Sequence, residues 1–404
     1  MSFAELALIV LVGLLGPALG SLPRLRAPVV VGEILAGVLL GPTALDAIHP
    51  DTPTAALLSD IGFALLMLIL GTHVPVTDPR LRREIPRATV AVAATFGIAV
   101  PIAYAISRVA HIHRFLPLAL LLVTSSAAVA LPILREASVR GETLTRTIAW
   151  ISVADVFSIL VVPLVASGRG SGQVLLGAIL VSLCAFALVI VGHATETAPG
   201  AAQVVHRVRK ASKKGGWALD LRLALLALFA LSALAQHFGT SLLVPGFAVG
   251  VAVASLGGPK RLTQQLIGIG EGFFVPLFFV LLGARINVRQ LFDSPRALLL
   301  AILLLVGAIV LHLAMSLTLR LPVWTGLLAT AQLGVPAAVA SLGLAAGWLT
   351  SAEAAAVLPA ALGSLAIAAA GSRLSGTAGS MRDRSRTHVT EDASDEATGG
   401  TLNP

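Results

Sequence analysis

The sequence predicts an all-α integral membrane protein with about 13 transmembrane helices. Of its 404 residues, 56% are hydrophobic and 12% are charged, and the mean hydropathy is +0.92. This composition lies far outside that of soluble domains. Apolar segments of membrane-spanning length recur along the chain. One of them, residues 147–166, carries a single carboxylate, Asp155, near its centre. A carboxylate at that depth indicates a polar site inside the helix bundle.

Thirteen apolar segments account for nearly the whole chain up to residue 371. A helix needs about 20 apolar residues to cross a bilayer, and most segments approach that length. Residues 372–404 are rich in Ser, Thr, Asp, Arg and Gly, and we expect a disordered cytoplasmic tail. The chain thus divides into a membrane domain, 1–371, and this tail. The segments are 3–20, 28–42, 57–74, 87–107, 115–134, 143–166, 172–192, 217–236, 242–256, 264–283, 297–318, 322–346 and 354–371.

Basic residues predict the orientation in the membrane. The first segment lacks the Lys/Arg-bearing start of a signal peptide, so we expect it to remain as a span with its N-terminus outside. With thirteen spans, 22 of the 28 Lys and Arg residues fall on the side of the C-terminus, which the positive-inside rule makes cytoplasmic. We therefore expect a multi-pass protein of the plasma (inner) membrane. This loop placement also argues against nucleic acid as the partner of the basic residues.

Several kinds of chemistry are not expected. Cys184 is the one cysteine, which excludes a disulfide or a multi-thiolate metal site within one chain. The sequence has no nucleotide-binding loop, no HExxH and no nucleophile elbow. It also has no paired catalytic carboxylates. We therefore expect neither an enzyme nor a cofactor or resident metal.

An internal repeat is visible in the sequence. Three stretches recur in the same order at an offset of 210 to 214 residues. The repeats would be spans 1–6 and 8–13, with span 7 as connector, so the second unit would enter the membrane upside down. Inverted repeats are typical of secondary transporters, whose site lies near mid-membrane. The pairs are 65–74 with 277–286, 127–130 with 337–340, and 32–41 with 246–257.

Asp155 is the leading candidate for an ion- or proton-binding residue. On a helix, Ser152 and Ser158 lie one turn to either side and share its face. A carboxylate with hydroxyls beside it indicates a pocket open to a proton or a cation. The alternative is a protonated Asp that hydrogen-bonds a neighbouring helix.

Two spans carry helix breakers at matching positions of the repeats. Span 5 holds the consecutive polar residues Thr124, Ser125 and Ser126, followed by Pro132, and span 12 holds Gly334 and Pro336. Interrupted segments at matching positions indicate a transporter site, because unwound carbonyls can ligate a cation. We therefore include Thr124, Ser125 and Ser126 with Asp155 and Ser152 in the predicted site. The alternative is ordinary proline kinks and close helix packing.

Three further ionisable residues lie in or near spans. His312, the one ionisable residue inside span 11, is expected either to pair with Asp155 or carry a proton, or to make a structural hydrogen bond. Glu33 in span 2 is a second-tier buried acid, and a structural hydrogen bond between close helices is favoured for it. Glu271 in span 10 is expected to reach the membrane edge or to cap a helix.

Five motifs taken together resemble the sodium/hydrogen exchanger family, in its bacterial monovalent cation:proton antiporter branch. That branch includes the glutathione-gated potassium efflux antiporters. The resemblance covers about residues 1–371. The motifs are PVVVGEILAGVLLGPTAL (28–45), DIGFALLMLILG (60–71), TSSAAVALPILRE (124–136), VADVFSILVVPL (153–164) and FFVPLFFVLLGARINV (273–288).

The resemblance implies a thirteen-helix fold, assembled as a homodimer. Spans 1–3 and 8–10 would form a dimerisation part. Spans 4–6 and 11–13 would form a core part that slides like an elevator, with the broken spans 5 and 12 crossing beside Asp155. Asp155 matches the family aspartate that binds a proton and a monovalent cation, Na⁺ or K⁺, in turn. Thr124 to Ser126 match the broken-helix motif.

Departures from the family pattern qualify this expectation. Ala154 stands where relatives have Asp, Asn or Gln, which suggests electroneutral one-for-one exchange. His312 stands where relatives carry Lys or Arg, and Val335 where potassium efflux relatives carry an acid. The nucleotide-binding domain of those relatives has no counterpart here, so nucleotide or glutathione gating is not implied.

Two other functions remain open at this stage. One is a sodium-coupled symporter for an organic anion on the same architecture, which would need a larger polar cavity. The other is a non-transporting sensor or assembly subunit, for which Ala154, His312 and Val335 would be the signs.

Overall fold

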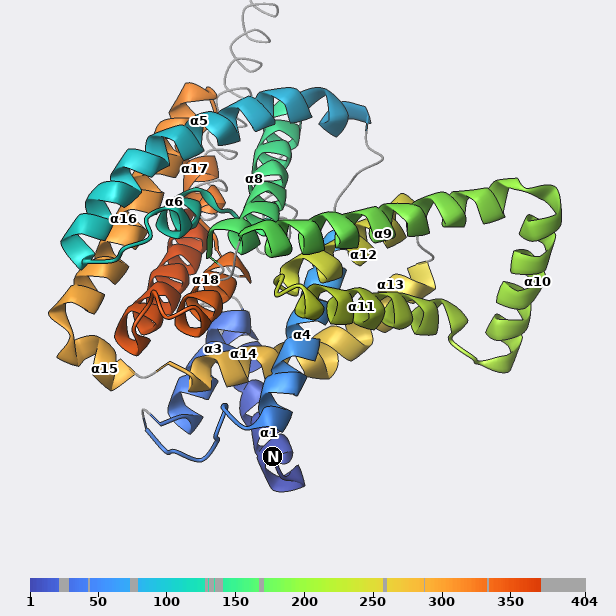
Figure 1. Ribbon diagram of the computed structural model, residues 1–404, viewed down its shortest axis with the longest axis horizontal. Helices are drawn as coiled ribbons and strands as arrows, with labels where there is room; N and C mark the ends of the chain where they lie inside the picture. Colours follow the sequence, from blue (N-terminus) through green and yellow to red (C-terminus); the bar gives the residue numbers. More distant parts are fainter. Residues whose placement is uncertain are drawn as a thin grey trace, which may run out of the picture.

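The regular elements of the described chain are helices, and no strand occurs in the ranges covered. A computed structural model describes residues 1–21, 29–42, 44–72, 79–127, 130, 134, 141–166, 171–256, 260–286, 288–332 and 334–371 (Figure 1). The predicted tail, 372–404, and Pro132 lie outside these residues. Within them, the predicted all-α membrane fold is confirmed.

The helices follow the predicted segments closely. They are α1 (Phe3–Gly13), α2 (Leu15–Ser21), α3 (Val29–Leu40), α4 (Pro53–Thr72), α5 (Pro79–Ala110), α6 (Leu116–Val123), α8 (Glu142–Ala166), α9 (Ser171–Thr197), α10 (Pro199–Gly215), α11 (Leu219–His237), α12 (Leu243–Ser255), α13 (Lys260–Ile269), the π-helical turn η1 (Gly270–Phe274), α14 (Val275–Ala284), α15 (Val288–Asp293), α16 (Pro295–Thr318), α17 (Val323–Ala329) and α18 (Gly334–Ala345). A further helix covers Ser351–Gly371.

Ten helices in the described ranges are long and apolar enough to cross a membrane. Two shorter apolar helices, α3 and α12, correspond to predicted spans 2 and 9. The remaining segment, 115–134, begins as α6 and then runs partly outside the described residues. The multi-pass architecture is therefore clear, and the count of thirteen stays a prediction.

Two regions extend beyond their predicted limits. Helix α5 has 32 residues and reaches well before the predicted start at residue 87, with Pro86 and Pro101 inside it. The predicted connection 193–216 is itself helical, because α9 continues to Thr197 and α10 follows almost at once. This connection carries most of its charge on α10.

Glycines allow two helix pairs to pack with their backbones almost in contact. Helix α3 lies along α14, and a Cβ built on Gly37 would stand 2.0 Å from the Val280 carbonyl oxygen. Helix α4 lies along α12, and a Cβ on Gly250 would stand 2.2 Å from the Leu68 carbonyl oxygen. Small residues at helix interfaces are a common means of association in membranes, where apolar side chains gain little by leaving lipid.

These two pairs are related by the offset seen in the sequence. Gly283 of α14 packs on the Ile34 carbonyl, and Gly71 of α4 packs on the Phe247 carbonyl. Gly71 and Gly283 are 212 residues apart, and Gly37 and Gly250 are 213 apart. Positions that match in sequence therefore make matching contacts. Two inverted repeats would produce this arrangement.

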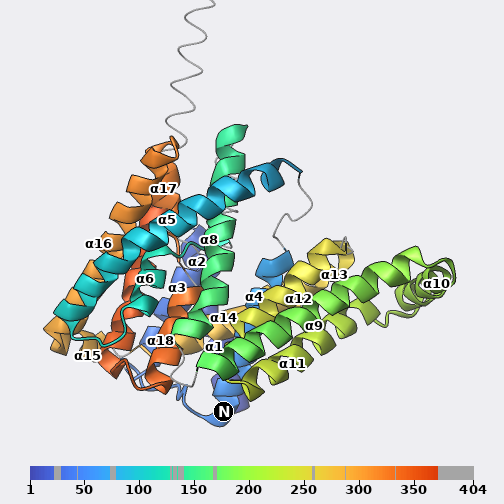
Figure 2. The ribbon, with the colours of Figure 1, turned by 45° about the horizontal axis from the view of Figure 1, so that its top comes forward.

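A second group of helices surrounds α8. Helices α5, α6, α17 and α18 all contact α8, and α16 packs against α5, α6 and α17 (Figure 2). In Figure 1 the group containing α5, α6, α8 and α16 to α18 lies toward the upper left, and the pairs built by α3, α4, α12 and α14 lie below and to the right of it. We call these the α8 group and the glycine-packed group.

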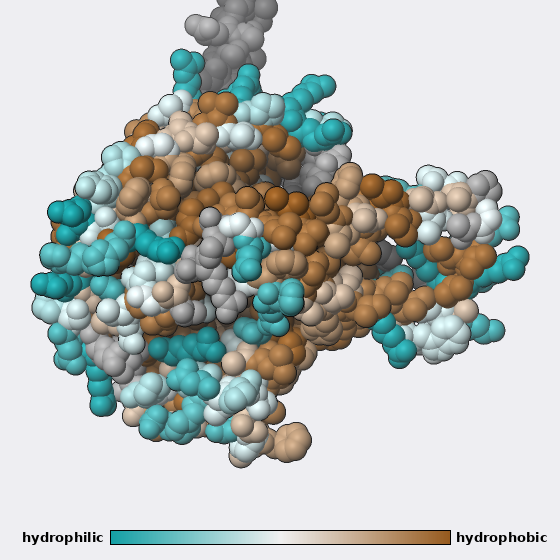
Figure 3. Space-filling view, in the orientation of Figure 1, coloured by the Kyte–Doolittle hydropathy of each residue, from teal (hydrophilic) through white to brown (hydrophobic). Residues whose placement is uncertain are grey.

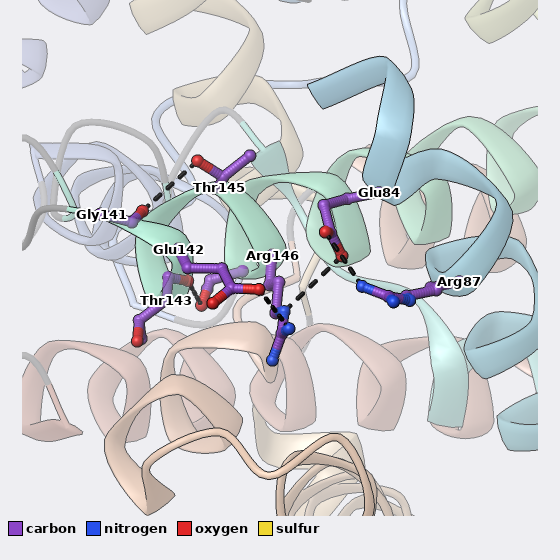
Figure 4. Close-up of polar contacts among 8 residues, drawn as sticks. Glu84, Arg87, Gly141, Glu142, Thr143, Thr145 and Arg146 are labelled. Carbon is purple, nitrogen blue, oxygen red and sulfur yellow. Dashed lines mark hydrogen bonds and ion pairs between the residues drawn. The ribbon is translucent and has the colours of Figure 1, made fainter. Parts of the chain in front are cut away.

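Ion pairs tie the beginning of α8 to the beginning of α5 (Figure 4). Arg146 Nε lies 3.7 Å from a carboxylate oxygen of Glu84, whose other oxygen lies 3.2 Å from Arg87. Arg146 also pairs with Glu142 one turn earlier on α8. A network of this kind holds geometry more than it adds stability, because its members are partly exposed.

Candidate functional site

Predicted span 5 is interrupted in the structure. Helix α6 ends at Val123, and Thr124 adopts an extended conformation (φ −61°, ψ 143°). Its N–H still closes the last turn on the Leu120 carbonyl at 2.8 Å. Residues 124–126 are not helical, and helical structure resumes at Ala127. The chain therefore presents unwound backbone at the three residues where the sequence places its polar run.

Predicted span 12 is interrupted as well. Helix α17 ends at Ala329, Thr330 to Gln332 are not helical, and α18 begins at Gly334. Pro336 falls in the first turn of α18. A proline costs little there, because the N–H groups of a first turn have no partner inside the helix. The breaker residues thus start a new half-helix here.

The two interruptions cross and hydrogen-bond to each other. The Ser126 N–H donates to the Ala331 carbonyl at 2.7 Å. The Gln332 side-chain amide donates to the Leu121 carbonyl, also at 2.7 Å, across 211 residues of sequence. We call this arrangement, residues 124–127 with 330–332, the crossover. Its unwound backbone is buried, as membrane proteins require.

Gln332 has a role that sequence reasoning missed. At the repeat offset of 210, Leu121 matches Ala331 and Ser126 matches Pro336. The symmetric counterpart of the Ser126 bond would run from residue 336 to the Leu121 carbonyl. Proline has no N–H, so that bond cannot form. The Gln332 side chain satisfies the Leu121 carbonyl in its place. The signal in the sequence was an amide side chain, Gln332, four residues before Pro336, which stands at the position that matches Ser126 in the repeat.

Asp155 lies on α8 against the crossover. Its side chain is 6% exposed. One carboxylate oxygen accepts a hydrogen bond from the Ala127 N–H at 3.0 Å. Ala127 is the first helical residue after the break, so the carboxylate faces the start of a half-helix. The partial positive charge of a helix N-terminus stabilises an anion there.

Hydroxyl groups with no partner in the described structure accompany Asp155. Ser125 of the crossover and Ser152 and Ser158 of α8 are buried, and none of their hydroxyl oxygens has a hydrogen-bond partner in the described ranges. Buried polar atoms are normally paired, so such a concentration indicates a missing ligand or water. Thr124 and Ser126 are buried at the same crossover.

His312 adjoins the site from α16 but makes other contacts. Its Nδ1 lies 2.8 Å from the Ala308 carbonyl, and a carbonyl only accepts, so Nδ1 carries the proton. The ring lies 5.8 Å from the Trp150 ring, centroid to centroid, on α8. In the described ranges no ion pair joins His312 to Asp155 within 4.0 Å. Of the roles considered for His312, the structure shows a hydrogen bond to its own helix and no pairing with Asp155 in the described ranges.

The other predicted acids lie elsewhere. Glu33 is 4% exposed on α3, in the glycine-packed group, and its side chain lies against Gly16 of α2. Glu271 is exposed within the π-helical turn η1. The structure thus brings together Asp155, Thr124, Ser125, Ser126 and Ser152, packs His312 on Trp150 of α8, and leaves Glu33 in the glycine-packed group.

Ala154 and Val335 occupy apolar positions. Ala154 is fully buried, and Val335 is 3% exposed in the first turn of α18. In the described ranges no group of three or more His, Cys, Asp or Glu side chains is arranged to hold a metal ion. Asp155, whose carboxylate accepts from the Ala127 N–H, is the acid that the described structure places against the crossover.

Comparison with known proteins points in one direction. The family model described as "Sodium/hydrogen exchanger, transmembrane" matches residues 7–372. YjbQ of Bacillus subtilis, named as a Na⁺/H⁺ antiporter, is 26% identical over 76% of this chain and 52% of its own length. Na⁺/H⁺ antiporter 3 of Methanocaldococcus jannaschii is 25% identical over 70% of this chain and 72% of its own. The chain therefore spans about half the length of the first of these relatives.

A solved structure shares the fold. The sodium proton antiporter MjNhaP1 of Methanocaldococcus jannaschii superposes with a TM-score of 0.63 at 16% identity, covering 93% of this chain and 96% of the other. At that identity the likeness concerns the fold alone. Since the family model covers far more than half of the residues, this chain belongs to the sodium/hydrogen exchanger family.

Proposed function

We propose that this protein is a secondary antiporter that exchanges a monovalent cation for H⁺ at one site built around Asp155. The observation that carries the proposal is the buried carboxylate at the crossover, accompanied by the unpartnered hydroxyls of Ser125, Ser152 and Ser158. Two interrupted helices meeting at a carboxylate are the features expected of a secondary transporter site.

Exchange follows from the electrostatics of a single buried acid. An ionised carboxylate is costly in a low-dielectric interior, so it cannot cross the membrane barrier uncompensated. A proton or a monovalent cation neutralises it equally well. The two ligands compete for the same oxygens, so the loaded site carries one or the other. A cycle in which the loaded site stays neutral therefore exchanges one proton for one monovalent cation.

The ligand set favours an alkali cation. Carboxylate, hydroxyl and carbonyl oxygens are what hard cations prefer. The matched relatives are named as Na⁺/H⁺ antiporters, so Na⁺ is the first ion to test, with K⁺ as the second. Because Ala154 supplies no second carboxylate, we propose an electroneutral cycle with one H⁺ per cation.

We propose an elevator movement between the two helix groups. The glycine-packed group, with its backbones in contact, suits a rigid dimerisation part built from spans 1–3 and 8–10 of two inverted repeats. The α8 group holds Asp155 and both interrupted helices, so it suits a core, spans 4–6 and 11–13, that carries the ion. A homodimer in the plasma membrane, with its N-terminus outside and its C-terminus cytoplasmic, agrees with the Lys/Arg distribution.

The decisive experiment measures proton-coupled cation transport in everted membrane vesicles. A pH gradient is established, and Na⁺, K⁺ or Li⁺ is added while a pH-sensitive dye reports dequenching. The wild type should respond to at least one ion, and Asp155→Asn should fall to the background of vesicles without the protein. Asp220→Asn, which changes an Asp at the start of α11 away from the crossover, is the matched control and should transport normally.

Full exchange by Asp155→Asn would refute the site. A wild-type protein that is folded and inserted but gives no flux with any of the three ions would favour a non-transporting sensor or assembly subunit. Sodium-dependent uptake of an organic anion would favour the symporter.

A further inference from the structure

Helix α10 lies outside the site proposed for ion exchange. It connects α9 to α11 at the end of the molecule farthest from the α8 group (Figures 1 and 2). Its 17 residues include five Lys and Arg residues and no acid. Helices α9 and α11 on either side are both apolar enough to cross a membrane. If α9 and α11 both cross the bilayer, a helix that joins their ends would run near the membrane surface.

One face of α10 is apolar and exposed. Val204 and Val208 are 58% and 40% exposed, and Ala211 continues the same line one turn later. These positions follow the i, i+4, i+7 spacing of a single helix face. A protein surface in water would not gain from such a stripe. A helix lying in a membrane interface buries it among the acyl chains.

Basic side chains border this stripe. Arg207, Lys210 and Lys214, at i, i+3 and i+7, make no ion pair within the part of the chain that the structure describes. Arg209, in contrast, pairs with Asp220 of α11 at 3.5 Å. Arg207, Lys210 and Lys214 stand beside the exposed apolar line. In Figure 3 the surface over α9 and α11 is largely brown, and teal side chains gather at the α10 end.

The corner after α10 holds the helix at its angle. Gly216 and Ala218 both have positive φ (69° and 49°), so the chain turns sharply between α10 and α11. Ser212 fixes the turn twice, since its carbonyl accepts from the Trp217 N–H and its hydroxyl from the Leu219 N–H, each at 3.1 Å. Trp217 is 53% exposed, and tryptophan is enriched at the depth of lipid headgroups.

We propose that α10 is an anionic-lipid-binding surface, in which Arg207, Lys210 and Lys214 bind phospholipid headgroups while Val204 and Val208 insert below them. Charge complementarity selects the occupant, because a basic amphipathic helix is attracted to an anionic leaflet and an apolar stripe needs acyl chains. On the Lys/Arg distribution this is the cytoplasmic leaflet, where anionic lipids concentrate. The inference does not depend on ion exchange at Asp155.

The test uses the full chain with a single reporter. Since Cys184 is the one cysteine, Cys184→Ser provides a cysteine-free background. Val204→Cys in that background carries an environment-sensitive fluorophore. The labelled protein is reconstituted into vesicles of phosphatidylcholine alone or of phosphatidylcholine mixed with the anionic lipid phosphatidylglycerol. His206→Cys is the matched control, because two residues along a helix place its exposed side chain on the opposite face.

The Val204 probe should shift to shorter wavelength, and be quenched by lipids with a quencher on the acyl chain, more strongly in the vesicles with phosphatidylglycerol. The His206 probe should not. The signal of the Val204 probe should become equal in the two kinds of vesicle in the triple variant Arg207→Glu/Lys210→Glu/Lys214→Glu. The double variant Arg82→Glu/Arg83→Glu on α5 should keep the difference between them. Equal signals from the two probes, or a Val204 shift that is indifferent to anionic lipid and to the triple reversal, would overturn the proposal.

Discussion

At the scale of residues, the Asp155 carboxylate is contacted by a backbone N–H group and not by a basic side chain in the described ranges. That N–H group belongs to Ala127. A permanent Lys or Arg partner would neutralise the carboxylate and compete with any incoming ion. A single N–H at a half-helix start stabilises the anion and still leaves room for a ligand. This arrangement suits a carboxylate that must exchange its neutralising partner.

A first prediction at this scale concerns Gln332. Gln332→Leu removes the donor to the Leu121 carbonyl, which is then buried without a partner. Leaving one buried polar group unsatisfied costs about 1–3 kcal/mol. We expect a lower thermal unfolding temperature, measured by fluorescence in detergent, and slower transport, because the crossover loses one of its two cross-links.

A second variant, at Pro336, tests the symmetry of the two repeats at the crossover. Pro336→Ala supplies an N–H at the position that matches Ser126. In the Gln332→Leu background it should recover part of the lost stability, because that N–H can reach the Leu121 carbonyl. A Gln332→Leu protein as stable as the wild type would contradict the role we assign to the amide. A Pro336→Ala change that restores nothing would contradict the symmetry.

At the scale of elements, helix association rests on glycine. Backbone carbonyls of one helix occupy the space where the Cβ of the other would be, in α3 with α14 and in α4 with α12. The same close contacts explain why the two short apolar helices, α3 and α12, are held firmly despite their length. Helix α12 lies against the 20-residue α4, and α3 lies against α14, which ends the 24-residue span Arg261–Ala284.

A prediction at this scale compares glycines with and without neighbours. Gly37→Ala and Gly250→Ala each place a methyl group within 2.0–2.2 Å of a backbone carbonyl oxygen, so the helices must separate. Overpacking of this kind costs about 1–3 kcal/mol. Both variants should unfold at lower temperature. Gly97→Ala on α5, which meets nothing within 4 Å, is the matched control and should be neutral or more stable.

Thermal unfolding in detergent, followed by intrinsic fluorescence, measures all three glycine variants under one condition. Similar unfolding temperatures for Gly37→Ala, Gly250→Ala and Gly97→Ala would show that the close contacts do not matter. A loss in only one of the first two would show that the two helix pairs contribute unequally.

At the scale of the whole molecule, the two helix groups differ in the features they carry. The glycine-packed group is closely fitted and holds no part of the crossover. The α8 group contains both interrupted helices, Asp155, and the ion pairs of Glu84 and Arg146 that join α5 to α8. A movement of one group against the other would leave the site internally unchanged.

A prediction at this scale links the ion to global stability. A ligand that binds only the folded protein stabilises it by about 2.7 kcal/mol at a hundredfold excess over its Kd. NaCl, but not choline chloride at equal ionic strength, should raise the unfolding temperature of the wild type. Asp155→Asn should lose this response. Because H⁺ occupies the same carboxylate, the sodium effect should shrink as pH is lowered.

The outcome that would contradict this linkage is a sodium response in Asp155→Asn as large as in the wild type, which would place the stabilising ion elsewhere. The comparison of NaCl with choline chloride controls for ionic strength, and Asp155→Asn controls for sodium binding away from the crossover.

Local patterns were enough to predict the membrane class, the approximate spans, the two breaks and Asp155. Hydropathy, helix breakers and an isolated carboxylate each act within one or two turns of chain, so a short window of sequence reports them. The family resemblance drew on the same local motifs, and the family match confirms it. The thirteen-span count, the domain division, the orientation and the ion-binding role of Asp155 and its neighbours remain predictions.

The family resemblance implied that the broken spans cross beside Asp155, and the tertiary structure decided which residues meet there. Asp155 accepts its bond from Ala127, Gln332 reaches Leu121, and His312 packs on Trp150, all between segments 28 or more residues apart. Nor did the sequence indicate that the basic connection would form a helix across the ends of two spans. Such pairings depend on how whole helices cross, and a side chain's own neighbours in sequence do not determine that.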